Sequence, residues 1–232
     1  MKKIGLAVFF VFLLSFSAWA FPPNTFKDTG VADRCLKMIK ALPKQPLSPA
    51  EKQGLFHMRQ EEKLARDVYF TLFQRWQLRV FYNIYQSEQR HMDMVKLLLD
   101  KYGLKDPVEK LGMGYFKDKK LAQLYTQLVR QGMMSFGGAV KVGAQVEEMD
   151  IYDLQQEMKK TDNQDIKLLY ANLMKASRNH LRIFMRWLQK MGETYTPHYL
   201  NPKEFQKIIS SPIERGPVDA QGKPLPLTKK KI

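Results

Sequence analysis

Apolar residues recur at helical spacing through most of the chain, and this pattern predicts four long helices. Ser48-Pro49-Ala50-Glu51 has the capping serine, first-turn proline and glutamate that are typical of a helix start. The expected helices cover residues 49 to about 76, 80–102, 135 to about 160, and 162 or 163 to 191. Since no stretch alternates apolar and polar residues as a strand does, we expect an all-α protein.

Shorter segments flank and connect these helices. A short helix is expected near residues 31–42, where Pro43 would stop it, and another near 118–131, ended by Gly132. Two helical hairpins joined by a crossover that carries the second short helix would form a four-helix bundle. The predicted divisions are an N-terminal extension over 21–47, the bundle over 48–195 and a Pro-rich, basic, surface-wrapping tail over 196–232.

Residues 1–20 have the pattern of a signal peptide. Two lysines precede an uncharged apolar run over 4–16, and Ala18-Trp19-Ala20 supplies the small residues that signal peptidase reads. The apolar run is shorter than the ~20 residues that span a membrane. We therefore expect cleavage before Phe21, a periplasmic or extracellular protein, and no transmembrane segment in the mature chain.

The mature chain would be strongly basic. Removal of residues 1–20 from the 232-residue chain leaves 212 residues and takes two lysines from a net charge of +15, which gives +13. Such a charge favours weak, salt-dependent contact with anionic envelope surfaces, and it gives no reason to expect specific nucleic-acid binding. Cys35 is the only cysteine, so an internal disulfide is excluded. The core, or a bound metal, must hold the fold together.

Each predicted long helix carries an acid or a histidine in the middle of its apolar inner face. They are Glu62 on the first helix, Glu88 and His91 on the second, Glu147 on the third with Asp150 at the edge of its face, and His180 on the fourth. An unpaired buried carboxylate is costly, so this set needs a compensating positive charge. A metal ion would supply it; the alternative is a polar network with Arg66, Arg178 or a protonated histidine.

The donor chemistry narrows the choice of metal. Glu88 and His91 are three residues apart, so both lie on one helix face and can bind one ion. Carboxylate and imidazole donors suit iron, manganese or zinc, and the lack of paired thiolates argues against a structural zinc finger. One Glu-x-x-His spacing is common by chance. What predicts a metal site here is that Glu88 and His91 fall at the same level as the polar residues on the other three helices.

Three motifs resemble those of ferritin-like proteins such as rubrerythrins and bacterioferritins. Glu62-Lys-Leu-Ala65-Arg66-Asp-Val-Tyr69 resembles the first-helix motif of rubrerythrins, and the segment from Ser87 to His91 resembles the second-helix Glu-x-x-His. With Ser-Arg-Asn-His-Leu-Arg from Ser177, they make residues 48–200 similar to an uncharacterised bacterial ferritin-like family known only as a domain of unknown function (family 2202). The resemblance implies a ferritin-like four-helix bundle with a dimetal site, usually of iron, and ferroxidase or oxygen- or peroxide-reducing chemistry.

The resemblance also assigns ligands by position. The residues that match the family's ligands are Glu62, Glu88, His91 and His180. Ser177 stands three residues before His180, where relatives carry a glutamate. The expected site is therefore one carboxylate short, and either Asp150 fills the gap or one of the two metals binds weakly.

The third-helix ligand has two candidates, Glu147 and Glu148. We expect Glu147, because Glu148 shares its helix face with Lys141 and Gln155. This choice depends on helical spacing alone, since the two acids are adjacent in the chain.

Two functions remain open from the sequence. The first is an exported redox protein, a di-iron oxidoreductase in which Glu62 and Glu147 bridge two metals and His91 and His180 are terminal ligands. The second is a metal-poor bundle that binds an anionic partner in the cell envelope through its basic surface. Ser177 favours the second function, and four polar groups in register favour the first. A homodimer is compatible with either.

Overall fold

The computed structural model describes residues 29–226, and this part of the chain is helical. Its only strand-type pairing is an isolated bridge between Val218 and Pro224. The helices are α1 (Thr29–Ala41), α2 (Pro49–Trp76), α3 (Arg79–Tyr102), α4 (Lys119–Met134), α5 (Phe136–Met158), α6 (Gln164–Lys190) and α7 (Pro202–Ser210). The predicted signal peptide, and the lysine cluster at 229–231, lie outside the described residues.

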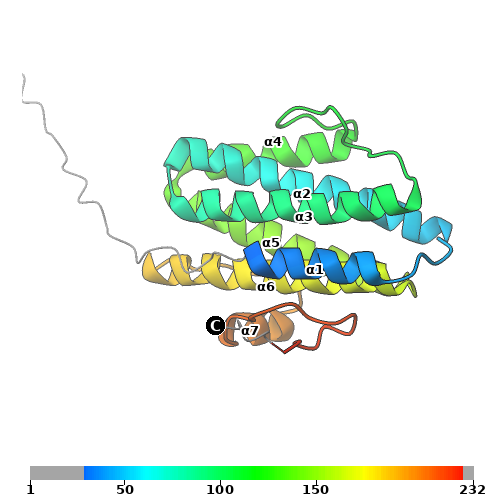
Figure 1. Cartoon of the computed structure of the whole chain (residues 1–232). Helices are drawn as coiled ribbons and strands as arrows, with labels where there is room; N and C mark the ends of the chain where they lie inside the picture. The colour runs from blue at the N-terminus through cyan, green and yellow to red at the C-terminus, as the bar shows by residue number, and fades with distance from the viewer. Residues whose placement is uncertain (1–28, 227–232) are drawn as a thin grey trace, which may run out of the picture.

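Four long helices form the body of the molecule (Figure 1). α2 packs along α3, and α5 packs along α6; the two pairs meet where α2 contacts α5 and α3 contacts α6. α4 lies in the connection between the pairs and packs on α2 and α5, while α1 and α7 both pack on α6. The predicted all-α class and the helical bundle are therefore confirmed for residues 29–226. Within that range no helix is long and apolar enough to cross a membrane.

Local signals explain why the predicted helix bounds agree closely with the observed ones. Ser48 caps α2: its side chain accepts a hydrogen bond from the Glu51 backbone N–H, and the Glu51 carboxylate accepts one from the Ser48 backbone N–H. α3 ends at Gly103, whose φ of 68° lies in the left-handed region that glycine adopts without strain. The short helix α4 extends past Gly132 to Met134, three residues beyond the expected end at 131.

Helix α7 was not predicted, because its region was expected to be an irregular surface tail. Its start nevertheless has a clear local cause. The Asn201 side chain accepts a hydrogen bond from the Glu204 backbone N–H, and Pro202 occupies the first turn. Phe205 and Ile208 are buried against the main apolar core. The many prolines nearby obscured a short helix that has a normal cap and an apolar face.

The segment after α7 is fastened to α6 by polar contacts. Glu214 forms ion pairs with Arg178, at 2.6 Å, and Arg182, at 2.9 Å. The Asn172 side-chain amide donates a hydrogen bond to the Val218 carbonyl and its oxygen accepts one from the Val218 backbone N–H. Up to residue 226, the C-terminal segment therefore packs on the bundle instead of leaving it.

The apolar interior consists of two clusters separated along the helices by a polar layer. On α2 the first cluster includes Leu55 and Met58, and the second begins at Leu64. On α6 the same change falls between Leu173 and Leu181. On α2, α3 and α6 the buried acids and histidines predicted from the sequence lie in this interval, whereas Glu147 and Asp150 on α5 come just before it. The bundle thus places its polar side chains together at mid-length, with apolar side chains on both sides.

Candidate metal centre

Two groups of three buried side chains meet in the polar layer. One group is Glu62, Glu88 and His91, and the other is Glu88, Glu147 and His180; in each, the candidate ligand atoms lie within 4.8 Å of one another. All four long helices contribute, and Glu88 belongs to both groups. The structure therefore brings together five of the six residues that the sequence singled out.

Glu88 lies between the two histidines. Its Oε2 is 2.6 Å from His91 Nδ1, and its Oε1 is 3.0 Å from His180 Nδ1. The two imidazole rings are stacked, with centroids 6.0 Å apart and an interplanar angle of 22°. The residue common to both groups thus comes from the second long helix, whereas Glu62 and Glu147, the acids expected to bridge two metals, belong to one group each.

Glu62 and Glu147 occupy matching outer positions. Glu62 Oε2 is 3.2 Å from His91 Nδ1, and Glu147 Oε2 is 3.3 Å from His180 Nδ1. The Tyr69 hydroxyl donates a hydrogen bond of 2.5 Å to the other oxygen of Glu147. Each histidine therefore faces one outer carboxylate and the shared Glu88, which gives the site an approximate two-fold pattern.

Asp150 is buried beside these groups but belongs to neither. It is 1 % exposed, and neither carboxylate oxygen has a hydrogen-bond partner among the described residues. Burial, followed by the charges of Glu62 and Glu147, raises its pKa well above the ordinary range. Ser177 is also buried, and its hydroxyl donates a hydrogen bond to the Leu173 carbonyl. Position 177 thus adds no charged group to the layer.

In the metal-free protein, burial and the charges of neighbouring side chains shift the pKa values of the acids and histidines in the polar layer. Burial alone would lower the pKa of both histidines, but the facing carboxylates raise it to about 10 for His91 and about 9 for His180. Burial raises the pKa of Glu62 to about 7, although His91 opposes the shift. Burial would also raise the pKa of Glu88, but the two histidines hold it well below its usual value. At neutral pH both imidazoles are therefore charged and compensate Glu88.

Arginine does not compensate these acids in the described structure. Arg66 pairs with Asp67 and donates a hydrogen bond to Gln89, and Arg178 pairs with Glu214. The arginine-based network considered from the sequence is therefore not the arrangement that forms. One oxygen of Glu62 remains buried without a hydrogen-bond partner, as do both oxygens of Asp150. Such atoms are costly in a protein interior unless a cation or a proton satisfies them.

Glu148, the alternative to Glu147, has a structural role on another face of α5. Its carboxylate accepts hydrogen bonds from the Tyr195 hydroxyl and from the backbone N–H groups of three residues, His198, Tyr199 and Leu200. These four donors satisfy a fully buried charge and fix the segment that leads into α7. The neighbouring acids thus divide their roles, with Glu147 in the polar layer and Glu148 bound to the C-terminal segment.

A third group of candidate ligands was not predicted from the sequence. His57, Glu61 and Asp153 also bring candidate ligand atoms within 4.8 Å of one another, and they lie outside both groups of the polar layer. His57, whose side chain is 40% exposed, is not among the residues predicted from the sequence. The four-residue spacing of His57 and Glu61 on α2 was a usable signal, but Asp153 comes from α5 and joins them only through helix packing.

Comparison with known proteins places the chain in a family. The model of an uncharacterised protein domain, DUF2202, matches residues 51–212. The chain belongs to this family. It is 54% identical over 181 residues to the uncharacterised protein MJ0754 of Methanocaldococcus jannaschii, a match that covers 78% of this chain and 98% of that protein.

A crystal structure of the same DUF2202 relative supports the fold. The hypothetical protein MJ0754 from Methanococcus jannaschii DSM 2661 superposes with a TM-score of 0.74 at 53% sequence identity, and covers 75% of this chain and 99% of that chain. The DUF2202 match contains every residue of the three groups described above. The printed name of this relative states no activity.

Proposed function

We propose that this chain is a ferritin-like protein whose polar layer holds a pair of metal ions, with iron as the preferred metal. The observation that carries the proposal is the position of Glu88 between two buried histidines, each of which faces one further carboxylate. A carboxylate shared by two such groups is suited to bridge two cations. The ferritin-like arrangement of the four long helices is part of this proposal.

The donor set fits a transition metal. Each group offers one imidazole nitrogen and two carboxylates from separate helices, and all of these residues are buried. Iron and manganese accept this mixture, and zinc does so as well, whereas calcium and magnesium prefer oxygen ligands alone. The buried oxygens of Glu62 and Asp150 that have no partner would be neutralised by the positive charge of the ions. Asp150 is the residue placed to compensate for Ser177.

The surrounding residues prepare the site for redox chemistry. A bound pair of iron ions would supply electrons for the reduction of oxygen or peroxide. The apolar clusters on both sides of the layer exclude bulk water from it. The Tyr69 hydroxyl holds Glu147 in place, and Glu88 holds the Nδ1 atoms of both histidines toward the centre. These features favour a ferroxidase or an oxygen- or peroxide-reducing enzyme.

The cellular setting belongs to the same proposal. The signal-peptide pattern of residues 1–20 and the mature charge of +13 suit an exported protein that works in the periplasm or outside the cell. In that setting a single domain over residues 48–195 would carry the site, and the basic surface would give weak contact with anionic envelope components.

Metal analysis of untagged protein tests the proposal. The full chain is expressed without added metal, purified from the envelope fraction and analysed by inductively coupled plasma mass spectrometry beside a Glu88→Gln variant. We expect close to two metal ions per wild-type chain after anaerobic loading with ferrous iron, and a loss of both in the variant. Wild-type protein that retains no more iron than the folded Glu88→Gln variant would refute a metal site in the polar layer.

A further inference from the structure

We propose that His57, Glu61 and Asp153 form a second, solvent-accessible site for a divalent transition-metal ion. Their candidate ligand atoms lie within 4.8 Å of one another. His57 and Glu61 come from α2, and Asp153 comes from α5. None of the three belongs to the groups of the polar layer, so this site does not depend on the central one for its ligands.

Glu61 provides the buried part of the site. The residue is 3 % exposed, and its Oε2 accepts no hydrogen bond from a donor group in the described structure. The Asp153 carboxyl lies within hydrogen-bond reach of the Glu61 carboxyl, so the two acids need a cation or a shared proton between them. Glu61 Oε1 lies 3.6 Å from His57 Nε2, which is longer than a hydrogen bond. An unpaired carboxylate oxygen in a protein interior is costly, and a cation held between Glu61, His57 and Asp153 would remove that cost.

The local charge favours a cation. Asp153, Glu62 and Glu157 act on Glu61 as further negative groups. The ammonium of Lys160 is 2.7 Å from Glu157 Oε1, so Glu157 already engages it. Although the chain as a whole is strongly basic, this part of the α2–α5 interface has an excess of acid.

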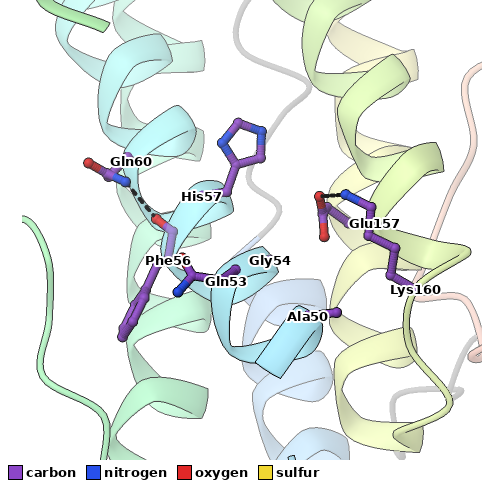
Figure 2. A pocket seen from close by; sticks show the side chains of 8 residues that line it. All are labelled: Ala50, Gln53, Gly54, Phe56, His57, Gln60, Glu157 and Lys160. Atoms are coloured by element: carbon purple, nitrogen blue, oxygen red, sulfur yellow. Dashed lines mark hydrogen bonds and ion pairs between the residues drawn. The ribbon is translucent and has the colours of Figure 1, made fainter. Parts of the chain in front are cut away.

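A surface pocket opens beside one of the three proposed ligands, His57. The pocket has a volume of about 340 Å³, and its lining includes His57, Gln60, Glu157 and Lys160 (Figure 2). The side chain of His57 is 40% exposed, whereas that of Glu61 is 4% exposed. His57 lines the pocket and Asp153 is half-buried, so an ion could reach these two ligands from solvent, whereas Glu61 is buried.

The donor types specify the class of ion. One imidazole and two carboxylates suit zinc, manganese, ferrous iron or cobalt, whereas calcium and magnesium prefer sites made of oxygen alone. Three protein ligands also leave coordination positions for water. The site is therefore suited to a readily exchanged divalent ion, not to a structural zinc held by four protein ligands.

Zinc titration followed by histidine NMR tests the site directly. The full chain contains four histidines, so selective ¹⁵N labelling gives few signals, and His57→Ala assigns the signal of His57. We expect zinc to shift the His57 signal in a saturable way. Asp153→Asn should weaken that binding by more than the ~10–100-fold that loss of an outer-sphere partner typically costs. Asp100→Asn removes an exposed carboxylate on a different helix, α3, and should leave the zinc affinity unchanged.

The same titration in Glu88→Gln protein separates this site from the central one. The His57 shift should persist in that background with unchanged affinity, whatever happens to the signals of His91 and His180. The proposal fails if zinc leaves the His57 signal unmoved in wild-type protein. It also fails if folded Asp153→Asn protein, checked by circular dichroism, gives the wild-type affinity, or if Glu88→Gln abolishes the shift.

Discussion

The Tyr69 hydroxyl donates a hydrogen bond of 2.5 Å to Glu147 Oε1 and so links α2 to α5 inside the polar layer. The phenol ring is fully buried and stacks on Phe81 and Phe184. A Cβ atom at Gly143 would lie 2.5 Å from the Phe184 ring, so the glycine is what allows α5 and α6 to approach at this level. Tyr69 therefore orients a candidate ligand from within the apolar core.

Tyr69→Phe should destabilise the metal-free protein. The substitution keeps the ring but leaves Glu147 Oε1 without its donor, while His180 still faces Oε2. Loss of the donor to a buried carboxylate oxygen costs roughly 1–3 kcal/mol in the free energy of unfolding. Tyr170→Phe is the matched control, because the Tyr170 hydroxyl is buried and has no hydrogen-bond partner among the described residues. Denaturant unfolding of chelator-treated protein measures both. Equal stability of the two variants would show that the bond to Glu147 contributes nothing.

The adjacent acids Glu147 and Glu148 should have separable effects. Glu147→Gln removes a carboxylate that faces His180, so we expect loss of bound metal with little change in the C-terminal segment. Glu148→Gln replaces the carboxylate that accepts hydrogen bonds from residues 195 and 198–200. We therefore expect faster amide exchange in that segment, with the metal retained. Metal analysis and hydrogen exchange on both variants check this prediction. If Glu148→Gln lost the metal and Glu147→Gln showed the faster amide exchange, the roles of the two acids would be reversed.

The sequence predicted the helices well where a local signal marks their ends. Ser48 at the start of α2 and Gly103 after α3 are such signals, and the bounds agree within one or two residues. Helix α7 was missed although Asn201 and Pro202 provide a normal start, because its apolar face of Phe205 and Ile208 is short. A segment of nine residues shows too little periodicity to stand out among prolines.

The sequence predicted which residues form the candidate site but not how they lie relative to one another. Helical spacing shows which residues share a face, and it therefore identified Glu62, Glu88 and His91. Spacing does not give the rotation or axial position of one helix against another. The central place of Glu88 between His91 and His180, and the meeting of Asp153 with His57, both depend on that packing and could be seen only in the structure.

The metal-free protein should lose stability as the pH rises from about 6.5 to about 10. His91 and His180 have pKa values of about 10 and about 9 in the folded protein, against 6.5 as the ordinary value. Their contribution is fully present below pH 6.5, where both states are protonated. It is lost as the folded protein also loses these protons. Glu62, with its pKa raised to about 7, acts in the same direction at lower pH.

Chemical unfolding of chelator-treated protein across this pH range checks the prediction. Glu88→Gln is the comparison, because it removes the carboxylate that faces both histidines and should make the pH dependence shallower. Metal-loaded protein should also show a weaker dependence, since ions replace the protons on the imidazoles. A metal-free wild-type protein that gains stability between pH 7 and 9 would contradict the protonation described for the polar layer.

Ser177→Glu should strengthen binding of the second metal ion while it destabilises the metal-free protein. Ser177 is 1 % exposed and lies three residues before His180 on α6, the same spacing that joins Glu88 to His91 on α3. A carboxylate at this position would add another buried acid to a layer that already holds Asp150 without a hydrogen-bond partner. The metal-free bundle should therefore unfold at lower denaturant concentration, and metal should recover more stability than in wild type. Ser177→Gln has nearly the same volume without the charge, so it should cause the packing loss and no gain in metal affinity. Calorimetric titration with ferrous iron under anaerobic conditions compares the three proteins, and equal affinities for the Glu and Gln variants would show that position 177 does not face the metals.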